Sequence, residues 1–402
     1  MTTELVSIPT LILSVFAIFI LLLIVFALIS RVRKNHRVFD QIAPSQIAYP
    51  FPSTASYPRV SIEFIDSVRA QTLVKSAYAD WLAKLILPDQ EPGQAFVRMG
   101  VEKNFLRYQV TSTSFGQALG MFFALVMAGS DLNAHQRFER LLAFCLSHPA
   151  SDQPELTSWQ SMPDVKPSRR QEADLHAENW IAFAILAAQR QWQVEGRFNL
   201  GAILIDRLTA LRSACQNRPS PEDKPCRVAT PAFWKLFAAQ TSDPAWLSLI
   251  SNLKSQSRDV MTRENYSFTE TNSPEAVQLA FQTLNLGIDA LVNGIETHKD
   301  LSGKLIQLSR FALEAYQASP KRAEILEDQS QFTPLAHLAC CAPAVIAYGD
   351  SALVQQFWNA LEIAETSKFD PLGTSLRLLA LIILAGLAWP LSLSAKPFDS
   401  AQ

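Results

Sequence analysis

From Ser67 onward, apolar residues recur at the three- and four-residue spacing of amphipathic helices, almost without interruption. Alternating apolar and polar runs rich in Val, Ile or Thr, which would indicate strands, are nearly absent. Capping residues or a proline in the first turn mark several helix starts, as in Thr230-Pro231 and Ser273-Pro274. The pattern therefore predicts an all-α protein. The expected helices span residues 67–86, 115–129, 134–147, 174–193, 198–213, 230–240, 244–258, 274–292, 301–317, 332–347, 350–365 and 371–389.

Short and long connections alternate between these helices, which suits six helical hairpins closed into an (α/α)6 barrel. A superhelical array would show the same periodicity, but no self-similarity appears at the periods of about 34 or 40 residues typical of helical repeats. The long connections at 148–173 and 214–229 are rich in Pro, Asp, Ser and Arg, and such connections tend to carry sites or partner contacts. We expect the barrel to occupy residues 63–393, with a C-terminal tail at 394–402.

A charge-free apolar run precedes the helical region. After an N-terminal tail at residues 1–9, residues 10–30 have the length needed to cross a hydrocarbon core of about 30 Å. No small-residue cleavage site follows, so the run predicts a retained transmembrane helix and not a signal peptide. Residues 31–62 then combine a basic flank with a Pro-rich tether that would hold the domain off the membrane.

Basic residues gather on one side of this run: Glu4 precedes it, whereas residues 31–37 carry several Arg and Lys. The positive-inside rule then predicts a single-pass protein of a bacterial inner membrane with its large domain in the cytoplasm; a periplasmic domain is the alternative. Residues 378–393 are also apolar, but their short length, Arg377 and two flanking prolines favour a buried last helix over a second span.

Composition excludes several classes of protein. With 49% apolar and 18% charged residues the chain can bury a large core. A net charge of −2, with no basic cluster beyond the membrane flank, gives no support for a nucleic-acid partner. Glycine is scarce and no Gly-rich phosphate loop occurs, so no nucleotide cofactor is expected. The five cysteines lack Cys-x-x-Cys spacing and predict buried free thiols, although Cys215 and Cys226 are spaced to bridge a loop in an oxidising compartment.

Small residues stand at the entrance of one helix, in the segment Thr113–Val126. Gly116, Ala118 and Gly120 would let this helix approach another backbone closely, and Met121–Val126 then reads as fully buried. A close approach of this kind serves either packing against neighbours or contact with a ligand. The stretch alone leaves both interpretations open.

Together with two later segments, this stretch resembles glycoside hydrolase family 8, and within it the cellulases that accompany bacterial cellulose synthases. Ser114–Val126 looks like the family's Ser-Glu-Gly-Gln-x-Tyr-Gly-Met helix, with Phe138–Leu142 and Leu156–Trp159 similar to the helix and loop that follow it. His176–Ala184 is similar to the family's Asp-x-Asp-Leu-Trp-Ile-Ala-Tyr-Ala helix, and Ser273–Gln278 to a Ser-Tyr-Asp-Ala-Ile-Arg segment. The resemblance implies an (α/α)6 barrel with a substrate groove at one end of its inner helices.

The chain departs from the family at its catalytic positions. Inverting glycoside hydrolysis needs a carboxylic acid and a carboxylate base about 6.5–9.5 Å apart. The resemblance places the acid at Phe115, which has no proton to give, and the family's sugar-holding Asp at His176. Glu178 matches the second Asp of the same motif, and Glu275 matches the base with one extra methylene. Glu275, His176 and Glu178 are therefore the catalytic candidates, with the acid missing.

Four further residues are candidates for binding substrate. Gln117 keeps its family place and either contacts sugar or caps its helix. Trp159 and Trp180 either stack on glucose rings or pack between helices. Asp174 is, with Glu178, the nearest carboxyl that a relocated acid would use. A metal site is not expected, because positions 174, 176 and 178 do not converge on one helix face.

Three functions follow from these observations. The first is a membrane-tethered, catalytically impaired glucan-binding or scaffold subunit of exopolysaccharide synthesis or secretion, with β-glucan and synthase components as its partners. The second is an active endo-β-1,4-glucanase with a relocated acid. The third is a cytoplasmic helical interaction scaffold without a carbohydrate role, which the charge asymmetry around residues 10–30 favours.

Overall fold

The protein is known from a computed structural model that describes residues 46–54, 65–89, 91–104, 107–162, 171–192, 196–217, 230–262, 273–318 and 332–393. The predicted transmembrane run 10–30, the tail 1–9, most of the tether and the tail 394–402 lie outside the described residues. Within the described ranges no helix is both long enough and apolar enough to cross a membrane.

The described chain is mostly helical, as predicted, and its helices begin and end close to the expected residues. They are α2 (Ser67–Leu85), α3 (Ser114–Val126), α4 (Ala134–Ser147), α5 (Leu175–Gln191), α6 (Leu200–Asn217), α7 (Pro231–Thr241), α8 (Ala245–Thr262), α9 (Pro274–Asn293), α10 (Ser302–Ala318), α11 (Pro334–Tyr348), α12 (Ser351–Ile363) and α13 (Pro371–Leu384). Two 3₁₀ helices, η3 (Ile295–Leu301) and η4 (Trp389–Ser392), complete the helical set of the described ranges.

The expectation of a purely helical chain was wrong in two places, since short strands occur between α2 and α3 and between α4 and α5. β1 (Ile86–Pro88) pairs antiparallel with β2 (Ala95–Val97). β3 (Gly100–Asn104), β4 (Arg107–Thr113) and β5 (Gln160–Ser161) form an antiparallel sheet in that order. The run Tyr-Gln-Val-Thr-Ser-Thr in β4 alternates as a strand does. It was not recognised because helical periodicity dominates the sequence on both sides.

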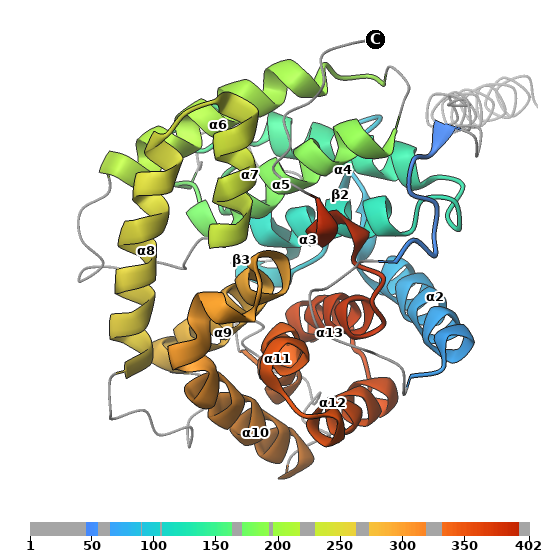
Figure 1. Ribbon diagram of the computed structural model, residues 1–402. Coiled ribbons are helices and arrows are strands. Elements are labelled where there is room, and N and C mark those ends of the chain that lie inside the picture. The colour runs from blue at the N-terminus through green and yellow to red at the C-terminus, as the bar shows by residue number, and fades with distance from the viewer. Residues whose placement is uncertain are drawn as a thin grey trace, which may run out of the picture. The chain divides into compact units, whose positions relative to one another are not determined.

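Helices α3, α5, α7, α9, α11 and α13 follow one another around an inner ring (Figure 1). Phe183 of α5 stacks on Phe233 of α7 with ring centroids 3.9 Å apart, and α13 packs back against α3. The alternate helices α2, α4, α6, α8, α10 and α12 pack outside this ring. A ring of this kind is consistent with an (α/α)6 barrel and differs from an open superhelical array.

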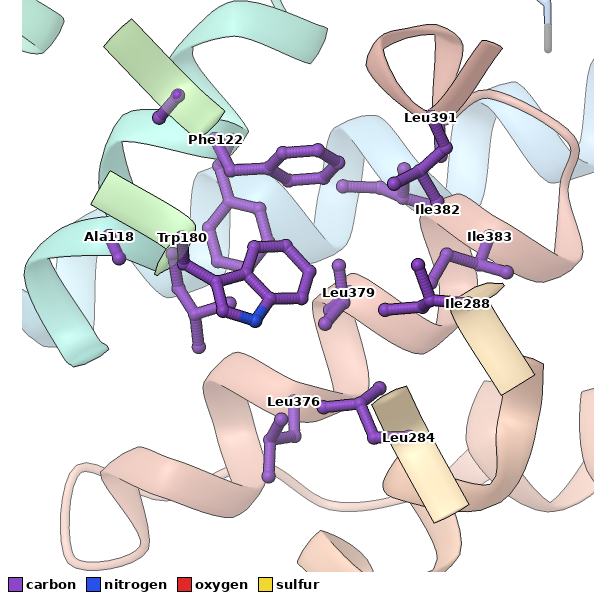
Figure 2. Close-up of a cluster of buried hydrophobic side chains, with 14 of the residues drawn as sticks. Ala118, Phe122, Trp180, Leu284, Ile288, Leu376, Leu379, Ile382, Ile383 and Leu391 are labelled. Carbon is purple, nitrogen blue, oxygen red and sulfur yellow. The ribbon is translucent and has the colours of Figure 1, made fainter. Parts of the chain in front are cut away.

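The centre of the ring is a dry hydrophobic core. Figure 2 shows side chains from α3, α5, α9, α13 and η4 pointing toward one another, among them Phe122, Trp180, Ile288 and Leu379. Every residue of α3 is buried. An inner helix that is covered on all sides reads as a nearly continuous apolar run instead of an amphipathic stripe. The buried last helix α13 therefore owes its hydrophobicity to its place in the ring, as expected for residues 378–393.

Two glycines permit close helix packing. A Cβ at Gly120 would lie 2.9 Å from Val97 Cγ2 and 3.0 Å from Leu141 Cδ1, so this residue serves packing against β2 and α4. A Cβ at Gly287 of α9 would lie 2.8 Å from the carbonyl carbon of Pro343, in the backbone of α11. The small residues of these helices are explained by close contact with their neighbours.

Part of the predicted tether lies against the domain. The Ala48 N–H donates to Gln191 O at 2.9 Å, and the Phe51 N–H donates to Ala128 O at 2.6 Å. The Gln191 side chain donates to Leu125 O at 2.9 Å. Residues 46–54 are thus held at the carboxyl ends of α3 and α5.

Three buried cysteines of the described ranges carry free thiols. Cys145, Cys340 and Cys341 are free and buried. Burial raises the pKa of the Cys145 and Cys341 thiols to about 12. Buried free thiols are confirmed at these three positions, whereas a bridge from Cys215 to Cys226 involves a residue outside the described ranges.

The α9–α11 contact gives a direct test of the ring. We expect Gly287→Ala to destabilise the protein by about 1–3 kcal/mol, because its new methyl group would meet backbone that cannot rotate away. Gly303→Ala in α10 is the matched control, since nothing lies within 4 Å of its Cβ position. Urea unfolding of both variants measures the difference, and equal midpoints would contradict the close packing.

Candidate functional site

The first turns of the inner helices meet at one end of the ring. Thr113 Oγ1 accepts from the Gly116 N–H at 3.1 Å, and Asp174 Oδ1 accepts from the His176 N–H at 3.0 Å, so both helices have capped starts. Thr333, which caps α11, donates to Asp370 Oδ2 of the α13 cap at 2.8 Å. Side chains that follow these caps are therefore brought together at the end of the ring where the resemblance places a substrate groove.

Aromatic rings occupy this end. Phe115 of α3 lies 4.8 Å from the ring of His176 and 5.5 Å from the ring of Phe281. Phe281 in turn contacts Phe332 at 5.4 Å, and Phe332 contacts His337 at 4.5 Å. We call these five residues the ring cluster. Phe115 is only 5% exposed, so the position matched to the family's acid is filled by packed hydrocarbon.

His176 is buried within the ring cluster and fixed by polar contacts. Its Nε2 lies 3.3 Å from Asn285 Oδ1, which also accepts from Thr230 Oγ1 at 2.8 Å. Because Asn285 Oδ1 is an acceptor, the contact fits the tautomer that carries its proton on Nε2. His176 thus links α5, α7 and α9 next to Phe115.

Glu178 points to a different neighbour. Its carboxylate accepts from the Thr157 N–H at 2.9 Å and forms an ion pair with Arg207 of α6, and both side chains are buried. Burial raises the pKa of the Glu178 carboxyl, and the charge of Arg207 opposes that rise. The structure therefore gives Glu178 a role in joining α5, α6 and the loop at Thr157.

Glu275 is an exposed residue in the first turn of α9. Ser273 Oγ caps this turn by accepting from the Ala276 N–H at 3.1 Å. A carboxylate at a helix N-terminus is stabilised by the helix dipole whether or not it has a catalytic role. Glu275 remains accessible to solvent, as a base that activates water must be.

The substrate-binding candidates divide into buried and exposed residues. Trp180 is fully buried against Phe115, Phe122 and Phe233, so it packs between helices and leaves no face for a sugar. Trp159 is 38% exposed, and its carbonyl accepts from the Ser114 N–H at 3.0 Å, directly before Phe115. Trp159 is therefore the tryptophan placed to meet a ligand at this end.

The other two candidates are less available. Asp174 is partly exposed and serves as the cap of α5. The Gln117 amide is buried, and neither its oxygen nor its nitrogen has a hydrogen-bond partner among the described residues. Within the described ranges, no three His, Cys, Asp or Glu side chains gather closely enough to ligate a metal ion.

Sequence reasoning missed the partners of these residues. Phe281 and Asn285 lie on α9 beyond the matched segment, and Arg207 lies on α6, outside every motif. Asn285 and Asp289 are polar residues that lie among apolar ones in α9, and buried polar residues of this kind indicate internal hydrogen bonds. That signal was present in the sequence, but it did not identify the partners.

Comparisons with known proteins agree with this geometry. No protein-family model matches the chain. An endoglucanase of Bacillus sp. (strain KSM-330) is 26% identical over 219 residues, 51% of this chain and 47% of that protein. A beta-glucanase of Niallia circulans is 24% identical over 217 residues, 50% of this chain and 51% of that protein. The chain thus spans about half the length of the curated relatives it matches.

Solved structures match over a larger share of the chain. A cold-adapted family 8 xylanase has a TM-score of 0.62 at 17% identity, over 86% of this chain and 98% of that chain. A beta-1,3-1,4-glucanase from Paenibacillus sp. X4 has a TM-score of 0.61 at 15% identity, over 84% and 98%. These structures share their fold with this chain. The predicted resemblance to glycoside hydrolase family 8 is thus confirmed at the level of the fold.

The buried ion pair gives a prediction with a defined pH dependence. Arg207→Met leaves the Glu178 carboxylate buried without its counter-charge, and we expect a loss of about 3–5 kcal/mol at pH 8. A carboxyl whose pKa is raised by folding stabilises the folded state at low pH, and this contribution disappears as the pH rises through the raised pKa. Removing Arg207 raises that pKa further, so the loss should be smaller at pH 5 than at pH 8.

The matched control lies on the same helix. Arg212 pairs with Asp243 at 2.7 Å with both side chains partly exposed, so Arg212→Met should cost at most about 1 kcal/mol. Urea unfolding at both pH values measures the two variants. A cost for Arg207→Met that does not change with pH would contradict the role given to Glu178.

Proposed function

We propose that this chain is a catalytically impaired, membrane-anchored relative of family 8 hydrolases, built as an (α/α)6 barrel behind a transmembrane helix at residues 10–30. Its function in this proposal is to bind β-glucan as an accessory or scaffold subunit of exopolysaccharide (cellulose-like) synthesis or secretion. The synthase or secretion components are its proposed partners. The domain lies in the cytoplasm by the positive-inside rule, with the periplasm as the alternative.

The burial of Phe115 carries this proposal. General acid catalysis contributes about 10²–10⁴-fold to reactions of this type, and a phenyl ring supplies none of it. Two carboxyl groups could take the place of the acid. Glu178 forms an ion pair with Arg207, and Asp174 caps α5. The ring cluster therefore places packed side chains where the family has its catalytic acid, while the fold around it is retained.

The choice of ligand rests on the relatives and on one exposed side chain. The similar proteins are named as an endoglucanase, glucanases and a xylanase, so a β-linked polysaccharide is the ligand class they suggest. Trp159 offers a flat apolar face beside the start of α3. Aromatic faces of this kind suit the apolar faces of sugar rings.

An active endo-β-1,4-glucanase with a relocated acid is the second candidate, and the exposure of Glu275 favours it. In that case Glu275 would be the base and His176 or Asp174 the proton donor. A cytoplasmic scaffold without a carbohydrate role is the third, because the ring cluster fills the end of the ring with its own side chains.

Binding and hydrolysis are tested on the same purified full-length protein. We expect retardation in gels that contain mixed-linkage β-glucan, with binding about tenfold weaker in Trp159→Ala, which corresponds to roughly 1.4 kcal/mol. Phe311→Ala, which removes an equally exposed aromatic from α10, should bind as the unmodified protein does. No reducing ends should be released between pH 4 and pH 8.

Two other results would each replace the proposal by a different function. Release of reducing ends that Glu275→Gln abolishes would establish the active glucanase in place of the proposal. Absence of binding to both β-glucan and xylan, with no hydrolysis, would leave the interaction scaffold.

Topology is tested by a reporter fused after Gln402. We expect fluorescence of a cytoplasmic reporter and no activity of a periplasmic phosphatase, because basic residues follow the apolar run. Phosphatase activity at this position would move the domain to the periplasm and would contradict the cytoplasmic assignment.

A further inference from the structure

A solvent-open hollow of about 130 Å³ lies beside the start of α4, away from the ring cluster. The start of α4 follows the carboxyl end of α3, whereas Phe115 is at the amino end of α3. A helix of 13 residues, at about 1.5 Å per residue, is about 20 Å long, so the two places are separate. The hollow is lined by Ile86, Pro88, Ala95, Asn133, Gln136, Arg137 and Arg140.

The two arginines of the hollow differ in their partners. Arg137 Nε donates to Asp131 Oδ2 at 3.1 Å, and the same oxygen accepts from the Tyr78 hydroxyl at 2.7 Å. Arg140 donates from Nη2 to Gln94 O at 3.2 Å, while its Nε is buried and has no hydrogen-bond partner. The carboxylate among these contacts, Asp131, is therefore bound by Arg137, Tyr78 and the Asn133 N–H at 2.9 Å, and Arg140 has no carboxylate partner among them.

The positive charge of the two arginines is only partly balanced, because Asp131 is the carboxylate that pairs with Arg137 and Arg140 has none among its contacts in the described part of the chain. Arg137 and Arg140 are one turn apart on α4, where like charges repel. Burial and the charge of Arg137 lower the pKa of Arg140. Both lie in the first two turns of the helix, where the dipole favours negative charge, and Asn133 makes no capping hydrogen bond there. An anion in the hollow would offset the repulsion between the two cations and would lie near the start of the helix, where the dipole favours it.

We propose that this hollow binds the phosphate group of a small phosphomonoester. A guanidinium fork donates to phosphate oxygens in pairs, and the Asn133 and Gln136 amides add donors for a third oxygen. The apolar wall of Ile86, Pro88 and Ala95 accepts the organic part of the ester. This site is independent of glucan binding.

Calorimetric titration of the full-length protein at constant ionic strength tests the proposal, with phenyl phosphate, inorganic phosphate and benzoate as probes. We expect saturable binding of phenyl phosphate, weaker binding of inorganic phosphate and weakest binding of benzoate. Arg140→Met should weaken phenyl phosphate about tenfold to a hundredfold, because a charge-assisted hydrogen bond is lost.

Two further variants keep the test informative if Arg140→Met unfolds. Gln136→Glu keeps the shape of the hollow and adds a negative charge, so it should abolish phosphate binding. Arg310→Met removes an exposed cation on α10 and should leave binding unchanged. Unfolding midpoints of all three variants separate lost binding from lost structure.

Several results would overturn the proposal. Absence of saturable binding, or binding that neither Arg140→Met nor Gln136→Glu weakens, would remove the site. Benzoate binding as tightly as phenyl phosphate would overturn the assignment of phosphate, and inorganic phosphate binding as tightly as phenyl phosphate would overturn the assignment of an ester.

Discussion

The structure depends on burying the inner helices on all sides at once. Each inner helix contacts two neighbours in the ring, and the described outer helices cover their backs. This burial removes water from every side chain that faces the ring, so each polar group inside needs an internal partner. Trp81 donates to Ser375 at 2.9 Å, and Glu178 is held by Arg207 and Thr157. The Gln117 amide is an exception, because it has no partner among the described residues.

The same constraint shapes the end of the ring where the family resemblance places catalysis. A hydrolase keeps a carboxylic acid and room for water there, and both are unfavourable in a closed apolar core. Here Phe115, His176 and Phe281 pack against one another. Stability and activity often compete at such positions, and packed rings favour stability. An apolar side chain at position 115 therefore suits the packing around it better than an ionisable one would.

Much of the fold could be predicted because long helices with capped starts leave a strong periodic signal. α4 begins at Ala134 and ends at Ser147, as the sequence predicts. The short strands were missed because β1, β2 and β5 have only two or three residues each, too few to show a period. The helical content was predicted from this periodicity. The closed ring was predicted from the alternation of short and long connections and from the family resemblance.

The candidate site was less predictable than the fold. Motif matching located Phe115 and His176, which do meet in the structure. It could not separate Trp159, which is exposed, from Trp180, which is buried, because a tryptophan in an apolar helix suits both places. Motif matching also did not identify Arg207 as the partner of Glu178, since a contact between residues 29 positions apart depends on tertiary packing.

The buried thiols have a consequence for where this domain can fold. At neutral pH a thiol with a pKa of about 12 is almost entirely protonated, and thiolate is the form that reacts with oxidants and disulfides. Cys145 and Cys341 are therefore inert on both grounds, by protonation and by lack of access. With respect to these residues, the domain tolerates a reducing or an oxidising compartment equally well.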